Sequence, residues 1–561
     1  MHTRDYLEIG IFLLVLTALT PILGKWMAGI YQKPTGAAFK CLGWLERACY
    51  CGAGVDAERG MGWKEYLAAL LWFNFLGFLL LFVILLAQGI PLLNPQGIKG
   101  LGVWLAFNTA VSFVTNTNWQ AYSGEAQLSY LSQMVGLGVQ NFVSAGTGMA
   151  VAVALARGLA GREIKTVGNF WADMTRSVVY ILLPLCLVFA VFLVSQGVVQ
   201  GFGGYVEAKT LEGAAQMIPQ GPAASQIAIK QLGTNGGGFF GVNSAHPFEN
   251  PTPLSNFFQV LSILLIPSAF VIMYGHLVEN RRQGWSLWWA MMGLLLIGLV
   301  VALWSEFHPA LPGEVMMEGK EVRFGVANSV LWGVATTAAS NGSVNAMHDS
   351  FSPLAGLVCL FNLKLGEIIF GGVGAGLYGM IMFVLLTVFL AGLMVGRTPE
   401  YLGKKIGARE IIWAVAAILI PNVCVLGGSA LAVLLPAGTA TLTNAGPHGL
   451  SEILYAFASA SGNNGSAFGG LGADNPFYNT ILAICMLLGR FGVIIPALAI
   501  AGAMGAKKTS VAGPGTFPTT GPLFVGLLIA VILIVGGLTY MPALSLGPIM
   551  DHLLWQSGRT F

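Results

Sequence analysis

The sequence predicts an all-α polytopic membrane protein with ten transmembrane helices, in which four pseudo-repeats of helix, pore loop and helix surround one axis. Three observations support this fold class. Of the 561 residues, 55% are hydrophobic and only 9% are charged, whereas soluble domains carry roughly 25% charged residues. Ten runs approach the length of about 20 apolar residues that a membrane span needs. Four short stretches rich in Asn, Gly, Ser and Thr recur between these runs at nearly even spacing.

The ten apolar runs define the spans that we expect. They lie at residues 7–29, 65–88, 129–157, 172–196, 253–277, 284–304, 374–396, 411–436, 478–504 and 522–542. Most Lys and Arg residues fall in the loops on one side of these spans, and that side should be cytoplasmic under the positive-inside rule. The opposite loops hold fewer, among them Lys230, Lys320 and Lys364. We therefore expect a multi-pass protein of the bacterial inner membrane with both termini and all four polar stretches facing outward.

The spans and polar stretches divide the chain into repeats. We expect a first transmembrane helix and cytoplasmic loop at 1–64, repeats at 65–160, 161–280, 281–398 and 399–506, and a last transmembrane helix within 507–561. Each repeat reads as a span, a short re-entrant segment, a polar loop and a second span. Re-entrant backbone at membrane depth is tolerated only where protein or a water-filled cavity satisfies its polar groups.

The four polar loops are the candidate binding site. Each follows a partly apolar run too short to cross a membrane, at 102–114, 222–233, 326–339 and 450–462. The candidate filter residues are Thr115, Asn116, Thr117 and Asn118, then Thr234, Asn235, Gly236 and Gly237, then Ser340, Asn341, Gly342 and Ser343, and finally Asn463, Asn464, Gly465 and Ser466. Gln120, just past the first loop, is expected at the outer rim.

The residue types in these loops suit a monovalent cation. A half-helix that descends from outside points its partially negative C-terminal end at the centre. Glycine reaches backbone conformations closed to other residues, and Asn, Thr and Ser stabilise tight turns. A ring of carbonyls can replace the hydration shell of K⁺, and the absence of carboxylates argues against a divalent-ion filter. A single such loop could be an ordinary polar turn, but four in register predict a cation pore.

The third repeat contains a candidate gate. Its apolar stretch from Phe351 to Val395 is too long for one span, and a glycine-rich segment interrupts it. The gate glycines are Gly371, Gly372, Gly374 and Gly376. Such a break between two half-helices could plug a pore below a filter, although close packing of helices by small residues is an alternative. Arg490 lies inside the ninth span, where charge is costly and usually functional or paired. Glu367 is its candidate partner, and a structural or snorkelling arginine is the alternative.

The loops also carry a family resemblance. Residues Thr115–Gln120, Gly233–Phe240, Ser340–Ser343 and Gly462–Ser466, together with Asn243–Thr252, resemble the channel-like A subunit of the bacterial Kdp potassium-importing ATPase. The resemblance covers essentially the whole chain. It implies a fold similar to the potassium-transporter superfamily, with K⁺ as the ion that the chain binds and selects. It also implies three partner subunits, KdpB (a P-type ATPase), KdpC and the small KdpF, and an ion path that turns below the filter toward KdpB.

The sequence is consistent with energy supplied from elsewhere. It contains neither a Walker A motif nor an Asp-Lys-Thr-Gly-Thr phosphorylation motif, and its cytoplasmic loops are too short for a nucleotide-binding domain. We expect membrane lipid around the chain and no nucleic acid, because a net charge of +3 is spread over many loops. A self-sufficient K⁺ channel or uniporter of the same superfamily remains an alternative. A secondary transporter of organic solutes is disfavoured, since those transporters usually show twofold repeats.

Overall fold

The computed structural model describes residues 1, 3–32, 37–309, 316–366, 368–509 and 517–559. Within them, ten helical segments are long and apolar enough to cross a membrane, and all ten overlap the predicted spans. They are α1 (Thr3–Gln32), α3 (Trp63–Ala87), a π-helical turn with α6 (Ser132–Ala160), α7 with α8 (Phe170–Ser195), α10 (Pro253–Leu277), α11 (Arg281–Glu306), α14 (Ala375–Met394), α15 (Ala408–Leu434), α18 (Pro476–Gly505) and α19 with α20 (Pro522–Gln556).

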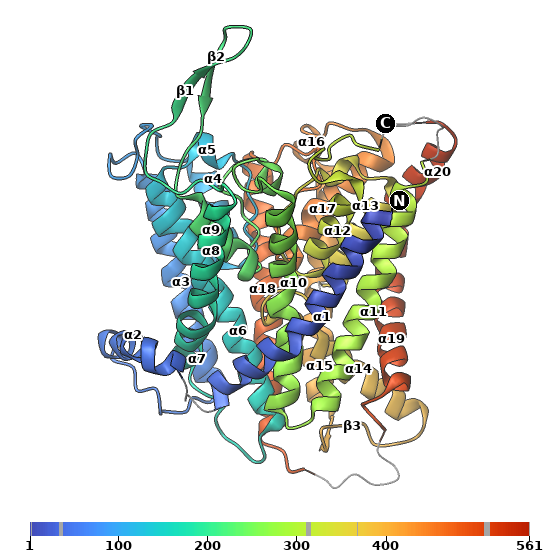
Figure 1. The fold of residues 1–561 in the computed structure, drawn as a ribbon. Helices are drawn as coiled ribbons and strands as arrows, with labels where there is room; N and C mark the ends of the chain where they lie inside the picture. Colours follow the sequence, from blue (N-terminus) through green and yellow to red (C-terminus); the bar gives the residue numbers. More distant parts are fainter. Residues whose placement is uncertain (2, 33–36, 310–315, 367, 510–516, 560–561) are drawn as a thin grey trace.

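Shorter elements fill the half of the molecule that holds the start of α1 (Figure 1). Four short helices lie there, namely α4 (Val103–Val114), α9 (Ala223–Leu232), α12 (Gly325–Ala338) and α17 (Gly446–Gly462). The antiparallel hairpin of β1 (Val206–Lys209) and β2 (Ala215–Ile218) projects from the same end. The remaining α-helices and strands are α2 (Ala37–Ala53), α5 (Gly124–Gln127), α13 (Pro353–Lys364), α16 (Pro436–Thr439), and the two-residue strands β3 (Glu400–Tyr401) and β4 (Lys404–Lys405).

Burial separates central helices from peripheral ones. In the apolar 18-residue stretches of the α6 and α10 segments, 83% of the residues are buried. In the corresponding stretches of α1 and α3, 22% of the residues are buried. The peripheral helices expose large apolar side chains such as Leu14, Trp72 and Leu538. Large apolar side chains exposed on helices of membrane-spanning length fit a lipid environment rather than water. The chain is therefore built as a multi-pass membrane protein around α6 and α10.

Local sequence explains how key helices begin and meet. Thr252 and Ser255 form a reciprocal capping box at the start of α10, with Pro253 in the first turn; this arrangement satisfies backbone donors that the helix leaves free. Gly24 of α1 packs so closely on α10 that a Cβ would lie 2.8 Å from the carbonyl oxygen of Ala269. Small residues at such contacts let membrane helices approach each other.

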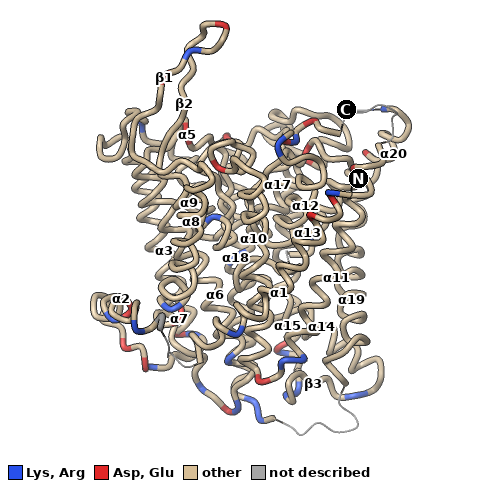
Figure 2. Tube along the Cα trace, viewed as in Figure 1, with Lys and Arg blue, Asp and Glu red and all other residues tan. Residues whose placement is uncertain are grey.

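The charges lie largely at the two ends of the bundle, and Lys and Arg gather at the end away from the start of α1 (Figure 2). Three lysines that the sequence analysis counts in the outer loops are exceptions. Lys230, Lys320 and Lys364 are buried, with 0%, 8% and 2% exposure. Lys230 and Lys364 belong to the short helices α9 and α13 rather than to loops, whereas Lys320 lies in the segment between α11 and α12.

Candidate ion-binding site

Each of the four polar loops directly follows a short helix. α4 ends at Val114, α9 at Leu232, α12 at Ala338 and α17 at Gly462. One residue at the start of each loop has a positive φ: Asn116 at 63°, Thr234 at 48°, Ser340 at 50° and Asn463 at 59°. This conformation is uncommon outside glycine and points to a functional constraint, most clearly for the β-branched Thr234. In the first loop, Asn116 rather than Thr115 occupies the turning position.

The same backbone hydrogen bond closes all four turns. In each loop the amide after the turning residue donates to the carbonyl five residues earlier, inside the preceding helix. The pairs are Thr117 to Ser112 at 2.9 Å, Asn235 to Lys230 at 2.9 Å, Asn341 to Thr336 at 3.1 Å and Asn464 to Ser459 at 2.9 Å. This bond satisfies a carbonyl that the helix end would otherwise leave free. The second, third and fourth loops share Asn-Gly after the turning residue, and the first loop, which has Thr117-Asn118 there, adopts the same backbone turn.

Side chains join neighbouring loops into a closed ring. Asn116 Nδ2 donates to the carbonyl of Thr234 at 3.1 Å, which links the first loop to the second. Asn341 Nδ2 in the third loop donates to the Lys230 carbonyl of α9 at 3.2 Å. Ser340 Oγ donates to the Asn463 carbonyl at 3.0 Å. Asn463 Nδ2 donates to Thr117 Oγ1 at 3.0 Å and closes the ring. Because these groups are buried, loss of one partner would leave an unsatisfied polar atom.

The glycines let the loop backbones touch. A Cβ on Gly236 would lie 2.0 Å from the amide nitrogen of Gly342, and a Cβ on Gly465 would lie 1.8 Å from the carbonyl oxygen of Thr117. Gly236 and Gly465 also have φ values of 82° and 94°, in the region that favours glycine. A Cβ on Gly342 would lie 2.6 Å from the carbonyl oxygen of Asn464. Side chains at these three positions would push the loops apart.

Gln120 braces the first loop against the second. Its Oε1 accepts a hydrogen bond from the Gly238 amide at 2.8 Å, and its Nε2 donates to the Gly238 carbonyl at 2.9 Å. The half-buried side chain also donates to the hydroxyl of Tyr122. Both ends of the amide are thus occupied by protein, so Gln120 holds the shape of the second loop.

A buried ion pair behind the second loop was missed by the sequence analysis. Lys230 of α9 and Glu249 are both fully buried, and Lys230 Nζ lies 2.5 Å from Glu249 Oε2. Lys230 Nζ also donates to Asn243 and Ser244, and Asn243 Nδ2 donates to the Gly236 carbonyl at 2.7 Å. The pair therefore supports the second loop from outside the ring. The presence of a lysine within the short apolar run 222–233 could have indicated a buried ion pair, because a buried lysine needs a partner.

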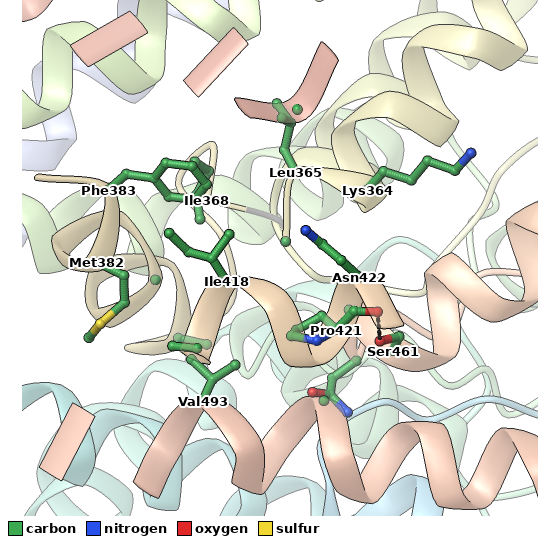
Figure 3. A pocket seen from close by; sticks show the side chains of 18 of the residues that line it. Lys364, Leu365, Ile368, Met382, Phe383, Ile418, Pro421, Asn422, Ser461 and Val493 are labelled. Carbon is green, nitrogen blue, oxygen red and sulfur yellow. Dashed lines mark hydrogen bonds between the residues drawn. The ribbon is translucent and has the colours of Figure 1, made fainter. Parts of the chain in front are cut away.

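A cavity of about 70 Å³ adjoins the third and fourth loops. A water molecule needs roughly 10–15 Å³ of such space, so the cavity has room for several waters or a partly hydrated ion. Its lining includes Ser340, Asn463, Arg490 and Ala375. Figure 3 shows Asn422, Pro421 and Ser461 at one wall, with the Ser461 hydroxyl donating to the Pro421 carbonyl.

The glycine break of the third repeat lies directly against the loops. It separates α13 from α14 and extends from Leu365 to Gly374, so Gly376 already belongs to α14. The Gly371 amide donates to the Ala338 carbonyl at 3.1 Å, and the Val373 amide donates to Thr234 Oγ1 at 2.9 Å.

The glycines of the break are tightly packed. A Cβ on Gly372 would meet Thr234 and Ser340 at 3.3 and 3.4 Å. Gly374 has a φ of 81°, and its Cβ would lie 2.2 Å from the carbonyl oxygen of Gly148. On Gly376 a Cβ would lie 1.7 Å from the Phe370 carbonyl oxygen. The break therefore shows the close packing that small residues allow. It also contacts two of the polar loops, as a gate below them would.

Arg490 of α18 is buried beside the break. Its Nη2 donates to the Ser144 carbonyl of α6 at 3.1 Å, and its Nη1 lies 3.4 Å from the Tyr378 hydroxyl. Within the residues that the structure describes, Arg490 forms no ion pair. Glu367, the candidate partner, lies outside the described residues. A guanidinium is therefore held at the cavity wall by neutral oxygen atoms.

Comparison with known proteins identifies the family. Residues 10–553 match the family model of KdpA, the potassium-transporting ATPase A subunit. The chain is 58% identical over 569 residues to the potassium-transporting ATPase potassium-binding subunit of Rhodospirillum centenum, covering 100% of this chain and 99% of the relative. It is 57% identical over 560 residues to the subunit of that name from Pseudomonas syringae pv. tomato, covering 99% of each. The chain therefore belongs to the KdpA family of potassium-transporting ATPase A subunits.

Proposed function

We propose that this chain is the potassium-binding subunit of a Kdp-type potassium-transporting ATPase, and that its four loops form the K⁺ filter. The closed ring of four loops with one shared backbone turn is the observation that carries the filter assignment. Membership of the KdpA family, whose curated relatives are named potassium-binding subunits, supports the choice of ion. In this role K⁺ is the transported substrate rather than a cofactor.

The ligand chemistry of the ring favours K⁺ over smaller or divalent ions. The sixteen candidate positions from Thr115 to Ser466 contain only Thr, Asn, Gly and Ser, which offer neutral oxygen atoms. The C-terminal ends of four short helices meet these loops and add partial negative charge. Weak, neutral ligands let an ion enter without holding it permanently, as conduction requires.

The repeat organisation and orientation are part of the same proposal. The four repeats are 65–160, 161–280, 281–398 and 399–506, each supplying one loop to a common axis. The loops face the outer side of the bacterial inner membrane, as do both termini. The clustering of Lys and Arg at the other end of the bundle (Figure 2) supports this orientation.

Below the filter, the cavity, the glycine break and Arg490 form the gate. A cation that leaves the third and fourth loops reaches a cavity whose wall carries a buried guanidinium. The repulsion between two cations discourages straight passage toward the inner side. The break, bonded to Thr234 and Ala338, narrows the same route. The ion is then directed sideways to KdpB, the subunit that hydrolyses ATP, within a complex that also contains KdpC and KdpF.

The decisive experiment alters the ring without adding charge. Gly465→Ala places a methyl group where the Thr117 carbonyl lies 1.8 Å away, and should separate the fourth loop from the first. ATPase activity of the purified complex is measured against K⁺, Rb⁺ and Na⁺. We expect a raised half-saturating K⁺ concentration and weaker discrimination. Unchanged affinity and ion preference in a well-folded variant would remove this loop from the filter.

A second experiment, on the chain purified without partners, distinguishes a pump subunit from a self-sufficient channel. The purified chain without partners is placed in K⁺-loaded liposomes, and K⁺ release is followed under an imposed voltage. The proposed function predicts little flux from the chain alone and ATP-dependent uptake by the complex. Sustained voltage-driven K⁺ flux from the chain alone would favour the channel or uniporter.

A further inference from the structure

A cluster of ligating side chains lies outside the ring, at the outer start of α17. His448 Nε2 is 2.9 Å from Asp349 Oδ1, and His448 Nδ1 is 2.9 Å from Asp551 Oδ2. Glu452, one helical turn after His448, completes the group. One ring nitrogen of His448 and one carboxylate oxygen each of Asp349 and Glu452 lie within 4.8 Å of one another.

Glu452 supplies an observation that the cluster alone does not. Its side chain is 1% exposed, and its Oε1 accepts a hydrogen bond from Asn444 Nδ2 at 2.7 Å. Its second oxygen, Oε2, is buried and has no hydrogen-bond partner among the described residues. A buried carboxylate oxygen without a partner is energetically costly. The charge count adds to this cost, since three carboxylates converge on one imidazole and no Lys or Arg forms an ion pair with them in the described part of the chain.

We propose that Asp349, His448 and Glu452 bind a divalent transition-metal cation, with Zn²⁺ or Mn²⁺ as the fitting ions. Imidazole with two carboxylates is a donor set that such ions accept. A tetrahedral centre with ligands at about 2.1 Å separates its ligand atoms by about 3.4 Å. The contact between His448 Nε2 and Asp349 Oδ1, now 2.9 Å, would therefore open slightly to admit the ion, and all three ligand atoms already lie within 4.8 Å of one another. The site differs from the loop ring in kind, because it offers anionic oxygens and a nitrogen instead of neutral oxygens.

Asp551 has the position of an orienting residue. Metal-bound histidines commonly donate their other ring N–H to a carboxylate, which fixes the tautomer and the ring orientation. With Nδ1–H donating to Asp551, metal binding would release the proton that Nε2 donates to Asp349 here, and the freed Nε2 lone pair would bind the ion. Asp551 lies on α20, near the end of the chain.

The site joins segments that are distant in sequence. Asp349 follows the third loop, His448 and Glu452 lie on the helix that leads to the fourth loop, and Asp551 lies on the last helix. The Asp349 amide also donates to the carbonyl of Phe468, just past the fourth loop. A bound ion would therefore cross-link the outer ends of the third and fourth repeats.

The test measures metal binding directly. The complex is purified through a tag without histidines, stripped with EDTA and titrated with ZnCl₂ against a fluorescent zinc indicator, with the metal content measured independently. Wild type should bind one Zn²⁺ per chain. Glu452→Gln should lose that equivalent, and Asp551→Asn should weaken binding by about 10- to 100-fold. Glu212→Gln, at an exposed acid of the β1–β2 hairpin, is the matched control and should bind as wild type does.

Three results would overturn the site. They are the absence of a stoichiometric Zn²⁺ and Mn²⁺ equivalent in wild type, equal affinity in wild type and Glu452→Gln, and displacement of Zn²⁺ by K⁺ at the concentrations that saturate ATPase activity. The last would make the cluster an outer K⁺ site. If Glu452→Gln fails to fold, two measurements still test the site. They are the number of Zn²⁺ ions bound per wild-type chain and the loss of Zn²⁺ affinity in Asp551→Asn.

Discussion

Gly236→Ala should be among the most damaging single-methyl changes in the chain. The added Cβ would lie 2.0 Å from the Gly342 amide nitrogen and 2.3 Å from its Cα, so two loop backbones must move apart. The φ of 82° adds strain that only glycine avoids. Left-handed backbone costs roughly 1–2 kcal/mol, and overpacking a tight interior costs about 1–3 kcal/mol. The two costs add to about 2–5 kcal/mol, by which the variant should destabilise the arrangement of the four loops.

If the four loops form the filter as proposed, that free energy should appear as weaker K⁺ binding. If the ring must recover its shape to bind the ion, about 2–5 kcal/mol corresponds to a loss of affinity of roughly 30- to several-thousand-fold, at about 1.4 kcal/mol per factor of ten. The assay is K⁺-stimulated ATPase activity of the purified complex, with the half-saturating concentration as the readout. Gly204→Ala is the matched control, because a Cβ there meets nothing within 4 Å.

The two variants separate a filter defect from general damage. Gly204→Ala should keep wild-type affinity and yield. Gly236→Ala should retain the assembled complex and any K⁺-independent activity while its K⁺ curve shifts to the right. A Gly236→Ala complex with unchanged half-saturation would refute the reasoning, since the contact with Gly342 could then relax without affecting the ion.

Further variants test the supports around the ring. Gln120→Ala removes two hydrogen bonds to Gly238 and should raise the half-saturating K⁺ concentration by several-fold, since net hydrogen bonds contribute about 0.5–1.5 kcal/mol each; an unchanged K⁺ curve would exclude the brace. Lys230→Met leaves Glu249 buried without its partner and should destabilise the chain by about 3–5 kcal/mol, seen as a lower thermal unfolding midpoint, and Glu249→Gln added to it should recover part of the loss. Arg490→Ala should raise passive K⁺ leak through the complex in liposomes and lower coupled uptake; normal uptake without leak would return Arg490 to a structural role.

The ten spans were predictable because membranes impose strong constraints on sequence. Apolar runs such as 253–277 have few ways to fold in lipid other than as helices, and the four loops stand out because polar residues are rare there. The turning position of the first loop was not predictable from composition, since Thr115 and Asn116 are both polar. Only the backbone geometry distinguishes them: Thr115 completes the last turn of α4, while Asn116 takes the positive φ.

The buried charges were harder to place for a physical reason. The side of a membrane on which a lysine lies is inferred from loop assignment, yet Lys230 and Lys364 belong to short helices inside the protein. Lys230 is tolerated because Glu249, nineteen residues later, meets it across a loop. Sequence periodicity indicates which face of a helix is buried. It does not indicate which residue from another segment of the chain will pack against that face.

The contact between the ring and the glycine break constrains how the two can move. Thr234 takes the strained turning position of the second loop, and its hydroxyl accepts the Val373 amide of the break while donating to the Gly233 carbonyl. The break also bonds to Ala338, the last residue of the helix before the third loop. A rearrangement of the break must therefore either disrupt these bonds or shift two of the four loops, at a cost of about 1–3 kcal/mol for each buried group left unpaired. The ring and the break are therefore coupled by these bonds, and if the ring binds an ion as proposed, that ion should also stabilise the break in the arrangement seen here.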